Sequence, residues 1–361
     1  MNIALLASGG VDSAVATHLM CERGEHPTLF YIKIGADEEK VFTCTMEEDL
    51  EMVNMLAKQY GLSLEVIDLH QEYWSSVVKY LIERVKLGLT PNPDVMCNSL
   101  IKFAAFYDKV GCDFDMTVTG HYATTVNLDG VKYLASGIDP VKDQTDFLCQ
   151  ITPAQLAKLH FPVGSLMKGE VRNIAQKFHL APAKRKDSQG ICFLGNTNYN
   201  TLLNHYLGDK EGDIIEWETG KVLGKHQGYW YYTLGQRKGL RLGGGPWFVV
   251  SKDIENNIVY ITREIDSPEQ LCNASCFELQ EFHTIATNEL LELPHEKRIY
   301  FKIRHSPEFE TGTFSFENGH YIIRSDRMIR GLAPGQFAVV YYPYSETQKL
   351  CIGSGEIKGR L

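Results

Sequence analysis

SGGVDS, residues 8–13, lies between an apolar run at residues 3–6 and a helix-like segment from about residue 14 to residue 23, which Gly24 ends. Two adjacent glycines let the backbone turn tightly and direct several N–H groups at one anion. The two serines add hydroxyl donors, and the N-terminus of the next helix favours negative charge. The stretch predicts a phosphate-binding loop, with an ordinary glycine turn as the alternative. It is not a Walker A loop, because no Gly-Lys-Ser/Thr follows it.

The first half of the chain alternates strand and helix patterns. Short apolar or β-branched runs occupy residues 3–6, 28–34, 64–69 and 116–119. Between the second and third runs, Thr45 and Glu48 form a capping box ahead of an amphipathic helix that Gly61 ends. This alternation predicts an α/β domain with a parallel sheet covered by helices and with ligands at the carboxyl ends of the strands.

The second half has a different pattern. After about Gly195, short alternating segments at residues 229–234, 247–251 and 258–262 are separated by glycine and asparagine turns, which predicts β structure. Residues 298–304, 320–324 and 337–342 look like strands of a small barrel. We therefore expect three domains: an α/β domain over residues 1–196, a small mainly-β central domain over 197–267, and a C-terminal β-barrel over 268–361.

Composition excludes several classes of protein. The 361 residues contain no apolar stretch near the roughly 20 residues that span a bilayer, and no signal peptide, so we expect a cytoplasmic protein with no membrane association. Nine cysteines, an odd number without a secretory signal, argue against a disulfide framework. Cys272 and Cys276 have no second pair to complete a zinc site, and no Cys-x-x-Cys supports an iron–sulfur cluster. We expect no protein-bound metal site.

The net charge of −9 is unfavourable for binding nucleic acid, but the position of charges matters more than their sum. Residues 221–241 hold five Lys or Arg and no acid, interleaved with the aromatic run 229–232. Residues 184–186 are all basic, and arginines recur at 324, 327 and 330. Each cluster alone is typical of a solvated face, yet three in one acidic chain favour a polyanionic partner.

TPNPDVMCN, residues 90–98, is the second informative motif. Its two prolines predict that no helix begins until after Asp94, so that Cys97 lies near the start of the next helix. A helix N-terminus lowers the pKa of a thiol and makes the thiolate more available. Asp94 is placed to act as a base or to orient a polar substrate. A buried structural cysteine with a helix-capping aspartate is an equal alternative.

KDSQGICFLG, residues 186–195, is the third motif. Cys192 lies in an apolar run beside the basic residues 184–186, which could stabilise a thiolate. By itself the segment is more typical of a core cysteine. Two candidate thiols in separate loops, together with the phosphate-binding loop, suggest that one cysteine carries sulfur and the other releases it.

Together these segments resemble the bacterial tRNA-specific 2-thiouridylase family of the ATP-pyrophosphatase (PP-loop) superfamily. The resemblance rests on SGGVDS at 8–13, TPNPDVMCN at 90–98, TGHY at 119–122, KDQTDFL at 142–148, KDSQGICFLG at 186–195, YYTLGQRKGL at 231–240 and APGQ at 333–336. Members replace O2 of uridine 34 in tRNA with sulfur, after ATP adenylates that oxygen so that AMP can leave. The resemblance implies a PP-loop catalytic domain over residues 1–196 and a tRNA-contacting central domain.

The resemblance also implies roles for individual residues. Cys192 matches the cysteine that carries a persulfide. Cys97 matches the nucleophile that attacks its S–S bond or assists sulfide release, which leaves a transient Cys97–Cys192 disulfide for a reductant to restore. Asp94 is the third expected catalytic residue. ATP binding, with Mg2+ offsetting the phosphate charge, is assigned to Leu6, Ala7, Ser8, Gly9, Gly10, Val11, Asp12, Ser13, Ile32 and Gly120.

The implied partners are tRNAs for Lys, Glu and Gln and a sulfur donor, either a cysteine desulfurase or a relay protein. Asn92, Pro93 and Asp94 match the stretch that meets the target base after it is flipped out of the anticodon. Other expected tRNA contacts are His121, Lys142, Asp143, Gln144, Arg304, His305 and Gln336. Ala14 and Ile34-Gly35 depart from the family pattern without touching the sulfur chemistry.

Two other functions compete with this interpretation. An amide-forming ligase of the same superfamily would adenylate a carboxylate and would need no cysteine pair, although no N-terminal cysteine glutaminase domain is evident. A tRNA-binding protein that has lost catalysis would not depend on ATP, but Asp12, Cys97 and Cys192 are all present.

Overall fold

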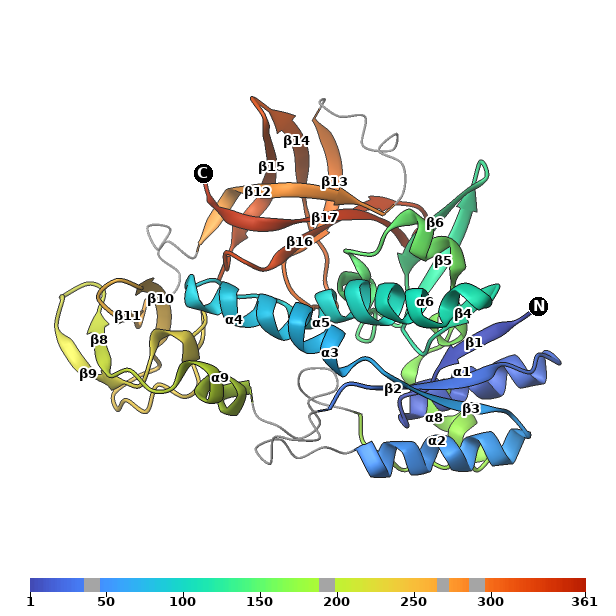
Figure 1. Cartoon of the computed structure of the whole chain (residues 1–361). Coiled ribbons are helices and arrows are strands. Elements are labelled where there is room, and N and C mark those ends of the chain that lie inside the picture. The colour runs from blue at the N-terminus through green and yellow to red at the C-terminus, as the bar shows by residue number, and fades with distance from the viewer. Residues whose placement is uncertain (36–45, 188–198, 265–272, 286–295) are drawn as a thin grey trace.

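The computed structural model describes residues 1–35, 46–187, 199–264, 273–285 and 296–361, whose strands form three sheets (Figure 1). The first sheet is parallel, with strand order β3-β2-β1-β4-β7. Its strands are β1 (Ile3–Leu6), β2 (Thr28–Lys33), β3 (Leu64–Asp68), β4 (Met116–Val118) and β7 (Leu159–His160). The chain runs outward from β1 to β3 and then returns to the other side of β1 at β4. Ligands of such sheets bind at the reversal of strand order, which here lies between β1 and β4.

Helices cover both faces of this sheet, because alternate residues of β1 enter different cores. Ile3 and Leu5 pack with residues of α1, α2 and α8, whereas Ala4 and Leu6 pack with residues of α3 to α6. The helices are α1 (Val11–Glu22), α2 (Met46–Tyr60), α3 (His70–Tyr73), α4 (Lys79–Lys86), α5 (Pro93–Met96), α6 (Phe106–Lys109), α7 (Pro153–Lys158) and α8 (Lys168–Lys177). Two π-helical segments, Trp74–Val78 and Cys97–Ala105, connect α3 with α4 and α5 with α6.

The central sheet has strand order β10-β11-β8-β9. It is built from β8 (Gly212–Glu216), β9 (Val222–His226), β10 (Phe248–Asp253) and β11 (Ile258–Thr262), and α9 (Tyr199–Leu207) precedes it. The expected strand at 229–234 is wrong: Tyr229–Tyr231 forms a 3₁₀ turn. The Tyr229 ring is buried in the central core, and its hydroxyl donates to the Lys86 carbonyl oxygen at 2.6 Å, so tertiary contacts override the local β pattern.

The third sheet closes into a six-stranded barrel because β12 pairs with both β15 and β17. The barrel strands are β12 (Ala274–Thr284), β13 (Lys297–Lys302), β14 (Glu310–Glu317), β15 (His320–Ile329), β16 (Phe337–Pro343) and β17 (Lys349–Arg360). A hairpin from the first half of the chain, β5 (Ala123–Leu128) and β6 (Val131–Ser136), extends this sheet through pairing of β6 with β17. The periodicity of the sequence did not predict that this hairpin pairs with a strand of the barrel.

The fold class expected from the sequence is confirmed: a parallel-sheet α/β domain, a small mainly-β domain and a C-terminal β-barrel. Helices α4 to α6 form a row beneath the barrel, and the parallel sheet lies below the α6 end of this row (Figure 1). Residues of these helices, of the barrel and of the parallel sheet share one hydrophobic core. The expected domain limits at residues 196 and 267 lie outside the described residues and stay predictions.

Candidate active site

The SGGVDS loop connects β1 to α1 at the reversal of strand order. The helix begins at Val11, three residues earlier than expected, with Gly10 as its N-cap in an extended conformation. The Ser13 hydroxyl closes the loop: it donates to the Gly10 carbonyl oxygen at 3.0 Å and accepts from the Ser8 N–H at 3.2 Å. The first N–H groups of a helix have no intrahelical acceptor, so this turn suits an anion.

Gly9 is required by its surroundings, and its replacement by alanine is expected to cost most of the affinity for ATP. Its φ of +73° disfavours any side chain, and a Cβ would lie 2.6 Å from the Asp49 carbonyl oxygen. The loop must therefore move away from α2. We expect Gly9→Ala to weaken ATP binding at least tenfold, measured by calorimetric titration. Gly24→Ala is the control, because that glycine also has positive φ but open space around it. Equal affinities of Gly9→Ala and Gly24→Ala would contradict the expectation.

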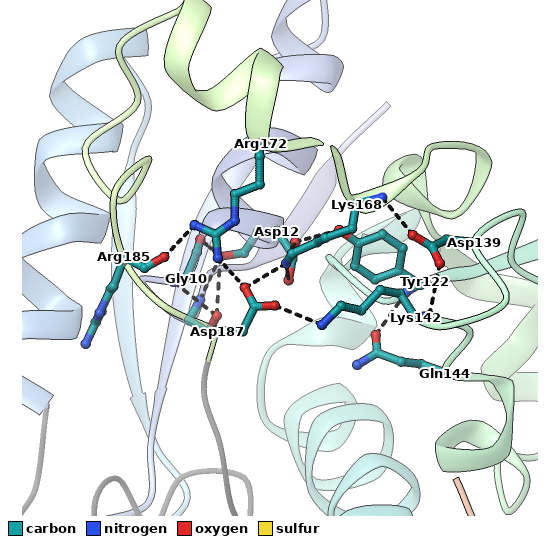
Figure 2. Close-up of polar contacts among 12 residues, drawn as sticks. Gly10, Asp12, Tyr122, Asp139, Lys142, Gln144, Lys168, Arg172, Arg185 and Asp187 are labelled. Atoms are coloured by element: carbon teal, nitrogen blue, oxygen red, sulfur yellow. Dashed lines mark hydrogen bonds and ion pairs between the residues drawn. The ribbon is translucent and has the colours of Figure 1, made fainter. Parts of the chain in front are cut away.

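Asp12 connects the loop to neighbouring elements (Figure 2). Its carboxylate accepts hydrogen bonds from the Tyr122 hydroxyl at 2.8 Å and from Lys168 Nζ at 2.7 and 2.9 Å. Burial and the Asp12 carboxylate both raise the pKa of Tyr122, which keeps its hydroxyl protonated as a donor. Gly120, after β4, permits this approach, because a Cβ there would lie 2.7 Å from the Ser13 nitrogen. These contacts hold the loop that follows β1 against the residues that follow the neighbouring strand β4.

A group of basic side chains surrounds the loop. Lys142 and Lys168 each place Nζ 2.9 Å from the Asp187 carboxylate, and Arg172 donates to the same group. Arg185 donates to the Gly9 carbonyl oxygen at 3.1 Å and pairs with Asp49 at 2.5 Å. Sequence reasoning missed Lys168 and Arg172, since they belong to no motif; only their i, i+4 spacing places them on one face of α8.

The segment that carries Cys97 differs from the sequence expectation in one respect. The helix begins at Pro93, with the Asn92 side-chain oxygen accepting from the Val95 N–H at 3.4 Å. The expectation that two prolines delay the helix until after Asp94 is wrong, because proline suits the first helical position. Cys97 directly follows this turn and is 1% exposed. Cys192, its expected partner, lies outside the described residues.

Residues 142–148 bring the loop, the Cys97 helix and the barrel together. Gln144 Oε1 accepts from the Tyr122 N–H at 3.0 Å, and the Asn98 amide nitrogen donates to the Phe147 carbonyl oxygen at 2.9 Å. Asp143 forms a 2.9 Å ion pair with Lys302 of β13, and both side chains are 1% exposed. The Asp143 side chain is therefore buried in the protein interior and is not available for contact at the surface. The other expected contact residues of this segment, Lys142 and Gln144, also have partners within the chain.

The remaining expected tRNA-contacting residues are held in different ways. His305 stacks on Phe147 with centroids 4.9 Å apart, and its hydrogen bond to Asp146 raises its pKa despite burial. Burial and Lys102 lower the pKa of His121, which keeps this imidazole neutral.

Two further residues of this expected set, Gln336 and Arg304, donate hydrogen bonds to backbone carbonyl oxygens. The Gln336 amide nitrogen donates to the Thr90 carbonyl oxygen at 2.8 Å, which ties the barrel to the start of the Cys97 motif. Arg304 donates to the Arg330 carbonyl oxygen.

Acidic neighbours compensate much of the positive charge noticed in the sequence. Arg324 pairs with Glu317 at 2.7 Å, and Arg327 pairs with Glu310 at 2.5 Å. Lys225 pairs with Asp213 at 2.7 Å. The exposed cations that remain from these clusters include Lys184, Lys186, Lys221, Arg237 and Lys238. The positive surface is therefore smaller than the sequence clusters suggested.

The fold and the loop define the class of protein. A glycine loop with serine hydroxyls at the strand reversal of a parallel sheet, next to several cations, is typical of α/β proteins that bind phosphate groups of nucleotides. Nowhere in the described ranges do three His, Cys, Asp or Glu side chains gather as a metal site. Among these residues, no helix combines the length and apolar character needed to cross a bilayer.

Comparison with known proteins narrows this class to a family. Residues 1–196 match the family of the tRNA methyl transferase HUP domain, 200–263 its PRC-barrel domain, and 275–357 the aminomethyltransferase β-barrel domain. A tRNA-specific 2-thiouridylase MnmA 1 of Bacteroides thetaiotaomicron is 55% identical over 99% of both chains. A tRNA-specific 2-thiouridylase MnmA 2 of Bacteroides fragilis is 54% identical over 99% of this chain and 100% of its own. A Parabacteroides distasonis relative of the same name is 53% identical over 99% of both. The chain belongs to the tRNA-specific 2-thiouridylase family and is an ATP-using PP-loop protein.

Proposed function

We propose that this chain exchanges O2 of uridine 34 in tRNA for sulfur in an ATP-dependent reaction. The observation that carries the proposal is the SGGVDS loop, closed by Ser13 at the strand reversal and joined through residues 142–148 to the helix of Cys97. Relatives that share 53–55% of their residues with the chain over nearly its whole length are named as enzymes of this activity.

The loop residues would bind the polyphosphate of ATP, with Leu6, Ala7 and Val11 flanking it and with Ile32 and Gly120 beside the nucleotide. The first backbone N–H groups of α1 have no intrahelical acceptor and suit an anion, and the Asp12 carboxylate holds Lys168 Nζ beside the loop. Mg2+ is usually held by one or two carboxylates together with phosphate oxygens. Asp12 is the carboxylate of this loop and fits that role only in part, since Lys168 and Tyr122 already engage it. The metal would offset phosphate charge.

The two cysteines would carry out the sulfur transfer. The terminal sulfur of a Cys192 persulfide attacks C2 of the adenylated uridine, and AMP leaves with the former O2. The Cys97 thiolate then attacks Cys192 Sγ, so that the S–S bond breaks, its electron pair stays on the sulfur bound to C2, and a Cys97–Cys192 disulfide forms. A two-electron reductant restores both thiols.

The base would enter beside Asn92, Pro93 and Asp94, at the first turn of α5. Asp94 is the ionisable group nearest in sequence to the nucleophile in this turn, which supports its role in activating the pyrimidine. The backbone of the anticodon arm would meet His121, Lys142, Gln144, Arg304, His305 and Gln336; Asp143 supports this surface from beneath. The proposed partners are tRNAs for Lys, Glu and Gln and a cysteine desulfurase or sulfur-relay protein, in the cytoplasm.

A reconstituted reaction tests this function. The purified chain is incubated with unmodified tRNA, ATP, Mg2+ and a persulfide source, and the digested nucleosides are analysed by mass spectrometry. We expect the wobble uridine to gain the mass of one oxygen-to-sulfur exchange only when ATP is present. Cleavage of ATP to AMP without thiolation would instead point to a different acceptor of the adenylate, as in an amide-forming ligase.

We expect the affinity for tRNA to fall as salt increases, despite the net charge of −9. Docking should use local cations such as Arg237 and Lys238, and each phosphate contact releases counterions. Because acidic residues already pair with many arginines, the slope should correspond to few contacts. The measurement is the dissociation constant of unmodified tRNA across a salt series. An affinity that stays constant from low to high salt would refute the expectation.

A further inference from the structure

The turn between β15 and β16 of the barrel (residues 330–336), called the barrel turn below, binds the segment that leads to Cys97. The Pro334 carbonyl oxygen accepts from the Thr90 N–H at 2.8 Å. The Gln336 amide nitrogen donates to the Thr90 carbonyl oxygen at 2.8 Å and to the Pro91 carbonyl oxygen at 3.3 Å. Both backbone polar groups of Thr90 are therefore bonded to the barrel.

The barrel turn is itself held in place by β17. The Gly335 N–H donates to the Ile357 carbonyl oxygen at 3.0 Å, and the Ile357 N–H donates to the Gln336 carbonyl oxygen at 2.8 Å. The turn also comes very close to the bound segment, because a Cβ at Gly335 would lie 2.8 Å from the Thr90 nitrogen. The Gln336 side chain thus extends from a fixed backbone, so its hydrogen bonds can define the position of the groups that accept them.

Thr90 and Pro91 directly precede the helical turn that carries the proposed nucleophile. Asn92 follows them as the N-cap of α5, and its side-chain oxygen accepts from the Val95 N–H at 3.4 Å. Cys97 is the C-cap of the same short helix. A shift of the Thr90 and Pro91 carbonyl groups would therefore move this helical turn, and Cys97 with it.

The barrel also fixes the other end of the Cys97 segment, through the residues that follow β6. The Asn98 amide nitrogen, next to Cys97, donates to the Phe147 carbonyl oxygen at 2.9 Å. The chain just before Phe147 is bound to the barrel by the buried ion pair of Asp143 with Lys302. Both ends of the segment that contains the nucleophile are thus connected to the barrel.

We propose that Gln336 is a positioning residue for the sulfur-transfer step, because its two hydrogen bonds set where Cys97 lies relative to the base. The proposal rests on the function proposed above. It gives the barrel a part in the geometry of the reaction, in addition to the tRNA contact expected for Gln336. Displacement of a reacting group by about 1 Å can slow a reaction about a hundredfold, so the loss of two hydrogen bonds next to this helical turn is enough to affect the rate.

Gln336→Met tests this role, since methionine keeps the length of the side chain but cannot donate to either carbonyl oxygen. Single-turnover thiolation at saturating tRNA, ATP and persulfide source gives the rate constant, and separate titrations give the dissociation constants of tRNA and ATP. We expect the rate constant to fall by about tenfold to a hundredfold, while both dissociation constants change by less than about threefold. Weaker tRNA binding with an unchanged rate constant at saturation would make Gln336 an RNA contact only and overturn the positioning role.

Gln348→Met is the matched control. The Gln348 amide nitrogen also donates from the barrel to another part of the chain, to Thr124 Oγ1 at 2.9 Å and to the Ser136 carbonyl oxygen at 3.3 Å. Neither of these partners belongs to the Cys97 segment, so this variant should keep the rate constant within about threefold. Equal losses of rate in Gln336→Met and Gln348→Met would reduce the effect to a general weakening of the barrel and overturn the proposal.

Hydrogen exchange supplies a readout that does not depend on activity. In Gln336→Met the amides of residues 94–98 should exchange at least about tenfold faster than in the unchanged chain, whereas Gln348→Met should leave their exchange unaltered. Unaltered exchange in Gln336→Met would overturn the proposal, and so would faster exchange without slower thiolation. The function fails separately: absence of thiolation in the unchanged chain, together with the expected exchange, would overturn the function but not the hold of Gln336 on this segment.

Discussion

Replacing Cys97 by serine is expected to abolish tRNA thiolation while ATP still binds. A serine hydroxyl is a far weaker nucleophile than a thiolate at neutral pH, so it cannot break the S–S bond of the persulfide. The side chain is 1% exposed and directly follows the first turn of the helix that begins at Pro93, so the near-isosteric change should preserve the fold. Cys192→Ser should have the same effect because no persulfide can form. Thiolation is measured by mass spectrometry of nucleosides and ATP binding by calorimetric titration.

Cys351→Ser is the control for these variants. Cys351 lies in β17 of the barrel and is also fully buried, but no role in catalysis is proposed for it. It should retain thiolation, with at most a loss of stability from burying a hydroxyl group. Full activity in Cys97→Ser or Cys192→Ser would eliminate the two-cysteine mechanism and would favour direct use of free sulfide.

Replacing Lys302 by methionine is expected to lower the free energy of unfolding by about 3–5 kcal/mol, because it leaves the buried Asp143 charge without its partner. The two side chains are each 1% exposed and 2.9 Å apart, and they connect β13 to residues 142–148. Methionine keeps the length and apolar stem of lysine, so the loss would come from charge rather than from packing. The measurement is a denaturant titration followed by fluorescence and circular dichroism.

Lys358→Met provides the comparison, since Lys358 forms an ion pair of the same length, 2.9 Å, with Glu278 but is 53% exposed. Exposed pairs contribute little, and this variant should lose less than about 1 kcal/mol. Adding Asp143→Leu to Lys302→Met should recover part of the stability, because it removes the unpaired charge. Equal losses in Lys302→Met and Lys358→Met would contradict the importance of burial.

The fold could be predicted from the sequence wherever a local pattern determines the structure. The parallel sheet and the edge at which it binds ligands could be predicted from the apolar runs that form β1 to β4 and from the glycines of the loop. Strands and tight turns of this kind depend mainly on residues that are neighbours in the sequence. The strand expected at 229–234 failed because the Tyr229 ring packs in a core made by distant strands. The start of α5 was misplaced because Pro93 occupies the one helical position that tolerates proline without loss.

The candidate site shows the same limit. The loop and the cysteine motifs are contiguous and could be read directly, and the resemblance supplied expectations for Ile32, Gly120 and the tRNA-contacting positions. Lys168 and Arg172 could not be found, because their contacts depend on which side chains the fold brings together across the chain. Nor could the sequence show that Asp143 is buried against Lys302, since both residues look like ordinary surface charges.

The hairpin of β5 and β6 restricts how this chain can be recombined with its relatives. It interrupts the α/β domain between β4 and β7, yet its strands pair with β17 at the opposite end of the sequence. A chimera that takes its barrel from another species at a single crossover would combine a hairpin and a barrel that were never selected together. Successful domain exchange should therefore require two grafts, the barrel and the segment at 123–136, and family members should tolerate crossovers less well than their three-part organisation suggests.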